Sequence, residues 1–183
     1  MITLVLGGAR SGKSAVAEAL TAAHGPPVTY VATMDVAGDP ELAARVEAHR
    51  NRRPAAWVTV DAGEDLPGLL AGLQGTVLVD SLGPWVAGRT MAGGGTDGAA
   101  LCDALRRRAG DSVLVSDEVG LAVHPSSAEG RLFRDALGTL NHAVSAIADR
   151  AFLVVAGRAL ALPSPPHSSP GATAAEAASR GVP

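Results

Sequence analysis

The feature that most constrains the fold is the stretch GGARSGKS at residues 7–14. It fits the pattern G-x-x-x-x-G-K-[ST] in full. The apolar run ITLVL before it, residues 2–6, predicts a buried strand. The alanine-rich segment 15–24 after it predicts a helix. Strand, loop and helix in this order are the context in which the pattern forms a phosphate-binding loop, or P-loop.

Each position of this loop has a chemical reason. Glycines allow backbone N–H groups to turn toward phosphate oxygens, and the following helix presents its positive end. Lysine reaches the β- and γ-phosphates and stabilises transferring charge, while the serine hydroxyl can hold Mg²⁺. Lys13 is also the one lysine among the 15 basic side chains. The predicted nucleotide-binding residues here are Gly7, Gly8, Ala9, Arg10, Ser11, Gly12, Lys13 and Ser14.

Carboxylates close two further apolar runs. VLVDS places Asp80 at the end of one run, and VLVSDEVG places Asp117 and Glu118 at the end of another. A P-loop enzyme needs an acidic residue at a neighbouring strand end to hold Mg²⁺. We predict that Asp80 fills this role together with Ser14.

Strand and helix patterns alternate along the chain. Apolar runs predict strands at 28–33, 57–60, 76–82, 112–120 and 151–157. Helical patterns cover 40–50, 66–73, 99–108 and 131–150. Nearly apolar strands separated by helices indicate an α/β fold, with a mostly parallel sheet covered by helices on both faces. Residues 1–162 form one predicted domain, and the proline-rich segment 163–183 predicts a disordered tail.

Composition narrows the class of protein. A net charge of −3 gives no support for nucleic-acid binding. The single cysteine, Cys102, excludes a disulfide framework. No apolar run reaches the ~20 residues of a membrane helix, and the N-terminus has no signal-peptide pattern. We therefore expect a cytoplasmic protein without a membrane span.

The segment RVEAHRNRRPAAW, residues 45–57, holds one histidine among four arginines. Arg45 and His49 are neighbours on one face of the predicted helix, at i and i+4. The arginines could simply complement the helix dipole. They could instead keep His49 neutral and nucleophilic while binding triphosphate oxygens. Spacing alone leaves both interpretations open.

Several blocks together resemble a known family. LGGARSGKS, YVAT, ELAARVEAHRNRRPAAWVTVD, VLVDSLGPWV, VLVSDEVGLAVHPSS and RLFRDALGTLNHAVSAIAD occur in the order found in the bifunctional adenosylcobinamide kinase / adenosylcobinamide-phosphate guanylyltransferase family of cobalamin biosynthesis. The resemblance extends from residue 1 to about residue 162. It implies a RecA-like P-loop NTPase fold and a homotrimer.

The resemblance also implies the chemistry. Such an enzyme phosphorylates adenosylcobinamide with ATP or GTP and Mg²⁺. It then transfers GMP from GTP to the phosphorylated product through a GMP-histidine intermediate. The intermediate falls on His49, which makes His49 and Lys13 the expected catalytic residues. Further nucleotide contacts implied by the resemblance are Thr33, Met34, Asp35, Arg50, Asn51, Arg52, Asp61 and Asp80.

The sequence departs from the family pattern at some of these places. Asp117 stands where the family commonly has asparagine, and Asp61 and Asp80 stand where it often has glutamate. Two other functions are compatible with the motifs. One is a simple P-loop small-molecule kinase that transfers only the γ-phosphoryl group. The other is a nucleotide-dependent switch protein with a protein partner.

Overall fold

The computed structural model describes residues 1–34, 47 and 53–164. The strands are Ile2–Gly7 (β1), Val28–Ala32 (β2), Val58–Asp61 (β3), Thr76–Asp80 (β4), Ser112–Asp117 (β5), Arg150–Val155 (β6) and Arg158–Leu162 (β7). The helices are Lys13–Ala22 (α1), Leu66–Gly72 (α3), Leu82–Met91 (α4), Gly98–Arg107 (α5) and Ala128–Ser145 (α6). Within the described ranges, no helix has the length and apolar character needed to cross a membrane.

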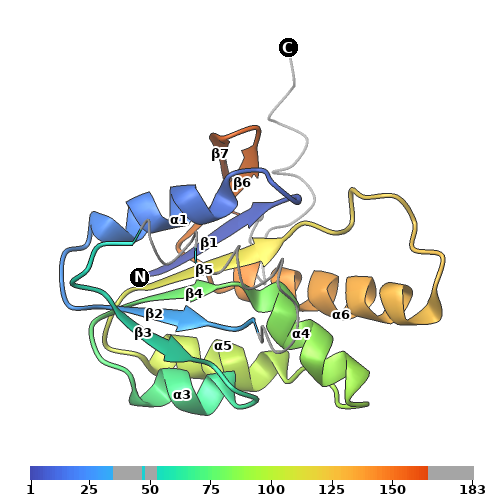
Figure 1. The fold of residues 1–183 in the computed structure, drawn as a ribbon, viewed down its shortest axis with the longest axis horizontal. Helices are drawn as coiled ribbons and strands as arrows, with labels where there is room; N and C mark the ends of the chain where they lie inside the picture. The colour runs from blue at the N-terminus through green and yellow to red at the C-terminus, as the bar shows by residue number, and fades with distance from the viewer. Residues whose placement is uncertain (35–46, 48–52, 165–183) are drawn as a thin grey trace, which may run out of the picture.

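The seven described strands form one sheet in the order β3-β2-β4-β5-β1-β6-β7 (Figure 1). Every pairing is parallel except that of β6 with β7. The carboxyl ends of β1 to β5 therefore lie at one edge of the sheet. In an open parallel sheet, ligands bind at this edge.

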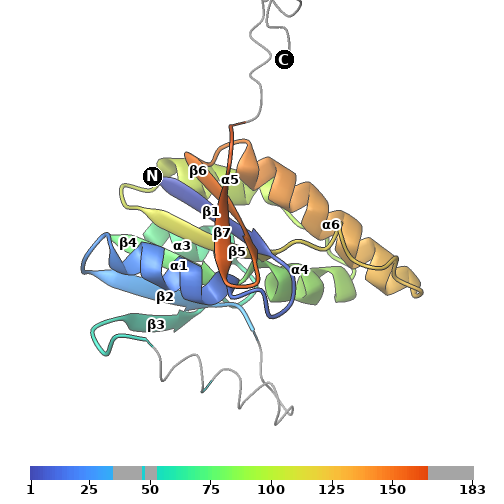
Figure 2. The ribbon, with the colours of Figure 1, turned by 90° about the horizontal axis from the view of Figure 1, so that it is seen from above.

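Helices cover both faces of the sheet, as predicted. Figures 1 and 2 show α1 on one face and α3, α4, α5 and α6 on the other. Alternation along β4 explains the two layers. Val77 and Val79 enter the larger core under α3–α6, whereas Leu78 enters the smaller core under α1, where it is joined by Ala17. Burial on both faces explains why the strands are nearly continuous apolar runs.

Capping residues set where three of the helices begin. Asp65, Asp97 and Ser127 accept hydrogen bonds from the backbone N–H groups of the first turns of α3, α5 and α6. The Ser127 cap begins α6 at Ala128, three residues before the predicted start at residue 131. Periodicity of apolar residues locates a helix well, but the polar first turn adds nothing to that signal.

Two elements were not predicted. Helix α4 begins at Leu82, inside the range predicted as strand 76–82, and β7 pairs antiparallel with β6 beyond the last predicted strand. Gly83 and Pro84 fall in the first turn of α4, where proline costs no hydrogen bond. The predicted helix 40–50 lies outside the described residues except for Glu47, which is helical. The predicted tail lies outside them from residue 165 onward.

The end of α5 is tied to the sheet by one arginine. Arg108 donates to the backbone carbonyl oxygens of Leu70, Leu73 and Gly75 at 3.0, 2.7 and 2.6 Å. It also donates from Nε to Ser112 Oγ at 3.1 Å. A single half-buried guanidinium thus satisfies acceptors from α3, the turn before β4 and the start of β5.

Replacing Arg108 with alanine should destabilise the fold. The change removes four hydrogen bonds from a charged donor and leaves carbonyl groups without partners. We expect the free energy of unfolding to fall by roughly 3 kcal/mol in urea denaturation. Arg107→Ala is the matched control, since Arg107 is exposed on the same turn, and should cost about 0.5 kcal/mol or less. Equal effects of the two changes would contradict this role for Arg108.

Candidate active site at the P-loop

The P-loop connects β1 to α1 with the backbone that its glycines allow. Gly12 has a φ of +92°, which side chains other than glycine rarely adopt. A Cβ atom there would also lie 3.2 Å from Gly157 Cα in the β6–β7 turn. Gly157 N donates to Ser11 O at 2.8 Å, so this turn supports the loop from outside. The P-loop conformation therefore depends on the unpredicted hairpin.

Strand register brings three aspartates to the same edge of the sheet. Asp117 at the end of β5 lies opposite Gly7, where the P-loop begins. Asp80 at the end of β4 and Asp61 at the end of β3 both lie opposite Ala32 of β2. The carboxylates at the ends of these three strands and the P-loop therefore lie at one edge of the sheet.

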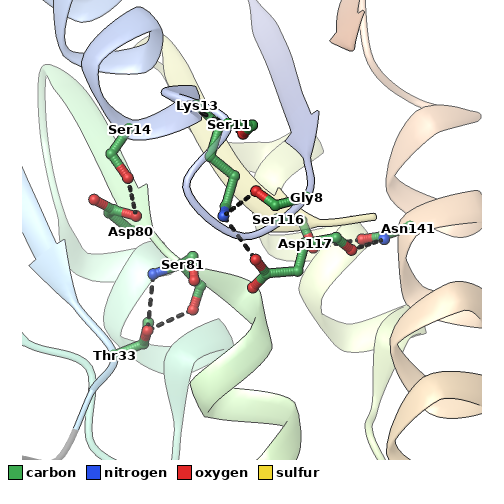
Figure 3. A network of polar contacts seen from close by, with 10 residues as sticks. All are labelled: Gly8, Ser11, Lys13, Ser14, Thr33, Asp80, Ser81, Ser116, Asp117 and Asn141. Atoms are coloured by element: carbon green, nitrogen blue, oxygen red, sulfur yellow. Dashed lines mark hydrogen bonds and ion pairs between the residues drawn. The ribbon is translucent and has the colours of Figure 1, made fainter. Parts of the chain in front are cut away.

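Ser14 and Asp80, the two residues predicted to hold Mg²⁺, lie within hydrogen-bonding distance of each other. Ser14 Oγ donates to Asp80 Oδ1 at 3.2 Å (Figure 3). Tyr30 Oη donates to Asp80 Oδ2 at 2.9 Å. A hydroxyl and a carboxylate are the oxygen donors that Mg²⁺ prefers, and Mg²⁺ in nucleotide sites takes few protein ligands beside phosphate and water. These residues therefore fit a nucleotide-bound Mg²⁺.

Lys13 is held by an ion pair with Asp117. Its Nζ atom lies 2.7 Å from Asp117 Oδ1 and donates to Gly8 O at 3.4 Å (Figure 3). Asn141 of α6 fixes the end of β5, because its Nδ2 atom donates to Asp117 O at 3.0 Å and its Oδ1 atom accepts from Ser116 Oγ at 2.6 Å. Lysine and aspartate thus face each other across the loop.

Thr33 joins the ends of β2 and β4. Its hydroxyl accepts a hydrogen bond from Ser81 N at 3.0 Å and donates to Ser81 O (Figure 3). Thr33, Met34 and Asp61 also line a cavity of about 680 Å³, together with residues of α4 that include Trp85 and Arg89. Three predicted nucleotide-binding residues therefore border one hollow beside the strand ends.

A second cavity, of about 730 Å³, lies between α5 and α6. Its lining is mostly apolar and includes Cys102 and Leu132. It contains none of the predicted site residues that the structure describes. The cavity at the strand ends is therefore the one that belongs to the candidate site.

The arginine-rich segment lies partly outside the described residues. The roles predicted for five residues remain predictions, because these residues lie outside the described ranges: Asp35, His49, Arg50, Asn51 and Arg52. Arg53 is described, and its guanidinium carbon lies 3.3 Å from the centroid of the Tyr30 ring. Its NH1 atom donates to Thr59 Oγ1 at 3.2 Å. The end of the segment is thus fixed against the tyrosine that bonds Asp80.

Tyr30 should stay protonated in alkali. Burial, followed by the neighbouring Asp80 carboxylate, raises the pKa of Tyr30 well above its ordinary value. Tyrosine in the unfolded chain ionises near about pH 10. The stability that neutral Tyr30 contributes is therefore complete below that pH and is lost as pH rises toward the folded-state pKa.

The chain has one tyrosine, so tyrosinate absorbance in the near ultraviolet follows Tyr30 alone. We expect no tyrosinate in the native protein up to about pH 10.5, and titration near about pH 10 after unfolding in guanidinium. Tyr30→Phe supplies the baseline. Ionisation of the native protein near its ordinary pKa would contradict the buried contact with Asp80.

Tyr30, Ser81 and Asn141 belong to this network but were not predicted from the sequence. Each contact crosses between strands or between a strand and a helix that are distant in the chain. A tyrosine within the apolar run YVAT is also what a core strand contains. The polar Ser116 inside the apolar run VLVSD was the one local signal of a buried hydrogen bond.

A parallel sheet with a phosphate-binding loop at its edge defines a P-loop nucleotide-binding protein of the NTPase fold. A solved ATPase from a bacterial type III secretion system has this fold, with a TM-score of 0.52, 12% identity, and coverage of 83% of this chain and 50% of that one. This likeness concerns the fold alone.

Sequence comparisons assign the family. The family model for cobinamide kinase / cobinamide phosphate guanyltransferase matches residues 3–162. The bifunctional adenosylcobalamin biosynthesis protein CobP of Pseudomonas aeruginosa is 38% identical over 177 residues, covering 93% of this chain and 99% of that protein. CobU of Salmonella typhimurium is 35% identical, covering 86% of this chain and 97% of its own. The chain belongs to the cobinamide kinase / cobinamide phosphate guanyltransferase family.

Proposed function

We propose that this protein phosphorylates adenosylcobinamide and then guanylylates the product, with His49 as the carrier of GMP. Family membership supports the two reactions. One observation supports placing both in this part of the molecule: contacts run without a break from Ser14 to Asp80, to Tyr30 and to Arg53. Arg53 lies four residues after His49 in the sequence. The P-loop and the histidine segment are thereby linked through three side chains.

In the first step, the hydroxyl of the aminopropanol arm attacks the γ-phosphorus of the nucleoside triphosphate. The bond from this phosphorus to the bridging oxygen breaks, the nucleoside diphosphate leaves and the hydroxyl proton passes to solvent. The loop amides and Lys13 stabilise charge on the transferring group. Ser14 and Asp80 would hold Mg²⁺, which supplies neutralisation of phosphate charge.

In the second step, a neutral His49 nitrogen attacks the α-phosphorus of GTP and pyrophosphate leaves. The phosphate oxygen of the phosphorylated corrinoid then attacks the same phosphorus, the P–N bond breaks and His49 is regenerated. Arg50 and Arg52 would bind the triphosphate oxygens, with Asn51 as a further contact. The arginines also disfavour a protonated imidazole, which keeps His49 nucleophilic.

The cavity at the strand ends is proposed to receive the nucleoside. Thr33, Met34 and Asp61 line it, and Asp35 follows directly in the sequence. The exposed Asp61 carboxylate in its wall is an acceptor for the N–H groups of a nucleobase. The resemblance to the family further supports a cytoplasmic homotrimer, which light scattering on the purified protein would test.

GTP labelled at the γ- or the α-phosphate distinguishes the proposed two-step function from a simple kinase and from a switch protein. The full chain is incubated with adenosylcobinamide, Mg²⁺ and GTP labelled at the γ- or at the α-phosphate. The proposal predicts γ-label in the phosphorylated corrinoid and α-label in the final corrinoid product. A simple kinase would transfer only the γ-label, and a switch protein would transfer neither. Either of these outcomes would refute the proposal.

A further inference from the structure

Asp117 is positioned from three sides. Its strand pairs with β1, so that Asp117 lies opposite Gly7 and Glu118 N donates to Gly7 O at 3.1 Å. Asn141 holds its carbonyl oxygen from α6. On the third side, Gly83 of α4 leaves room for the carboxylate, because a Cβ atom there would lie 2.6 Å from Asp117 Oδ2. Contacts from β1, α6 and α4 therefore set the direction of the Asp117 side chain.

The Asp117 carboxylate contacts Lys13, the residue whose ammonium group binds nucleotide phosphates in a P-loop. Lys13 Nζ lies 2.7 Å from Asp117 Oδ1, and the two side chains are only 13% and 30% exposed. A partly buried pair is screened less by water and salt than a surface pair. In a P-loop the same ammonium group binds the β- and γ-phosphates. Phosphate oxygens and Asp117 therefore compete for Lys13.

We propose that Asp117 lowers nucleotide affinity by pairing with Lys13, so that the phosphates of a triphosphate must displace this carboxylate from the ammonium group. Asp117 is thus a positioning residue that acts through Lys13. It weakens binding because it competes with the phosphates for the ammonium group. This inference rests only on the nucleotide-binding part of the proposed function, since it requires neither the corrinoid nor His49.

The test is the dissociation constant of GTP, measured by calorimetry on the full chain in EDTA so that metal does not contribute. Asp117→Asn keeps the shape of the side chain and removes its charge, and we expect GTP to bind about tenfold more tightly. Asp103→Asn is the charge-matched control, because Asp103 is exposed on α5 and pairs only weakly with Arg106, at 3.4 Å. It should change the dissociation constant by less than about twofold. Unchanged or weaker binding by Asp117→Asn would overturn the proposal.

A second pair of variants separates competition for Lys13 from direct repulsion of phosphate. Against the Lys13→Ala background, Asp117→Asn should change the GTP dissociation constant by less than about twofold, since no ammonium remains to be released. A tenfold gain in that background would mean that the carboxylate acts on the phosphates directly, and the proposal would fail. If the protein transferred neither label to the corrinoid, the proposed function would fail, but the two GTP-binding results would be unaffected. The proposed function and the role of Asp117 can therefore fail separately.

Discussion

Lys13→Ala should lower the rate of phosphoryl transfer from GTP to adenosylcobinamide by about 10³-fold. The change removes the one ammonium group that the structure directs into the P-loop, where its Nζ atom also bonds Gly8 O. Because charge on the transferring phosphoryl group rises toward the transition state, the loss should fall on kcat as well as on KM. Initial rates with γ-labelled GTP measure both constants.

The control for this loss is Arg107→Ala, which removes an exposed cation from α5. It should leave kcat and KM within about twofold of the original values. Circular dichroism melting curves verify that both variants fold. Transfer by Lys13→Ala within threefold of the unmodified rate would show that the P-loop lysine is not the phosphoryl-stabilising group.

Local sequence pattern was enough to predict the sheet, the P-loop and the edge where the site lies. Apolar runs predicted all described strands except β7, and the G-x-x-x-x-G-K-S stretch lies between β1 and α1, which begins at Lys13, two residues before the predicted start. Asp80 could be proposed from the sequence as a metal ligand because a carboxylate at the end of a parallel strand emerges at the ligand-binding edge. These inferences depend on residues that are close in the chain.

Contacts that depend on strand order could not be predicted in this way. The order β2-β4-β5-β1 sets Asp117 beside Lys13 and Tyr30 within reach of Asp80. In the sequence, Asp117 is only an alternative to Asp80 as the acidic residue at a strand end. The structure gives each aspartate its own partner: Asp80 bonds the P-loop serine and Asp117 pairs with the lysine.

The unpredicted elements α4 and β7 have local causes. Gly83 and Pro84 resemble a turn signal, yet proline is accepted in the first helical turn and glycine there makes room for Asp117. Strand β7 has only five residues, is mostly exposed and lies at the edge of the sheet. Its turn nevertheless holds Ser11 of the P-loop through Gly157.

His49→Ala should separate the two proposed reactions. The variant loses the nucleophile that accepts GMP, so formation of the guanylylated corrinoid should fall by about 10⁴-fold or more. Phosphorylation of adenosylcobinamide uses Lys13 and the loop amides and should stay within about threefold. The phosphorylated corrinoid therefore accumulates, which chromatography of the products would detect.

His142→Ala is the matched control, because His142 is an exposed histidine on α6. Both products should form at unchanged rates in this variant. If His49→Ala abolished phosphorylation to the same extent as guanylylation, the histidine segment would be needed for nucleotide binding as a whole. The assignment of His49 as the carrier of GMP would then be wrong.

The most direct measurement omits the corrinoid. The protein is incubated with GTP labelled at the α-phosphate and with Mg²⁺, denatured, and digested for mass spectrometry. A P–N bond to GMP on the peptide that contains His49, stable in alkali and cleaved by acid, is the predicted result, with no label on His49→Ala. Label that persists in His49→Ala, or its absence from the unmodified protein, would contradict the covalent mechanism.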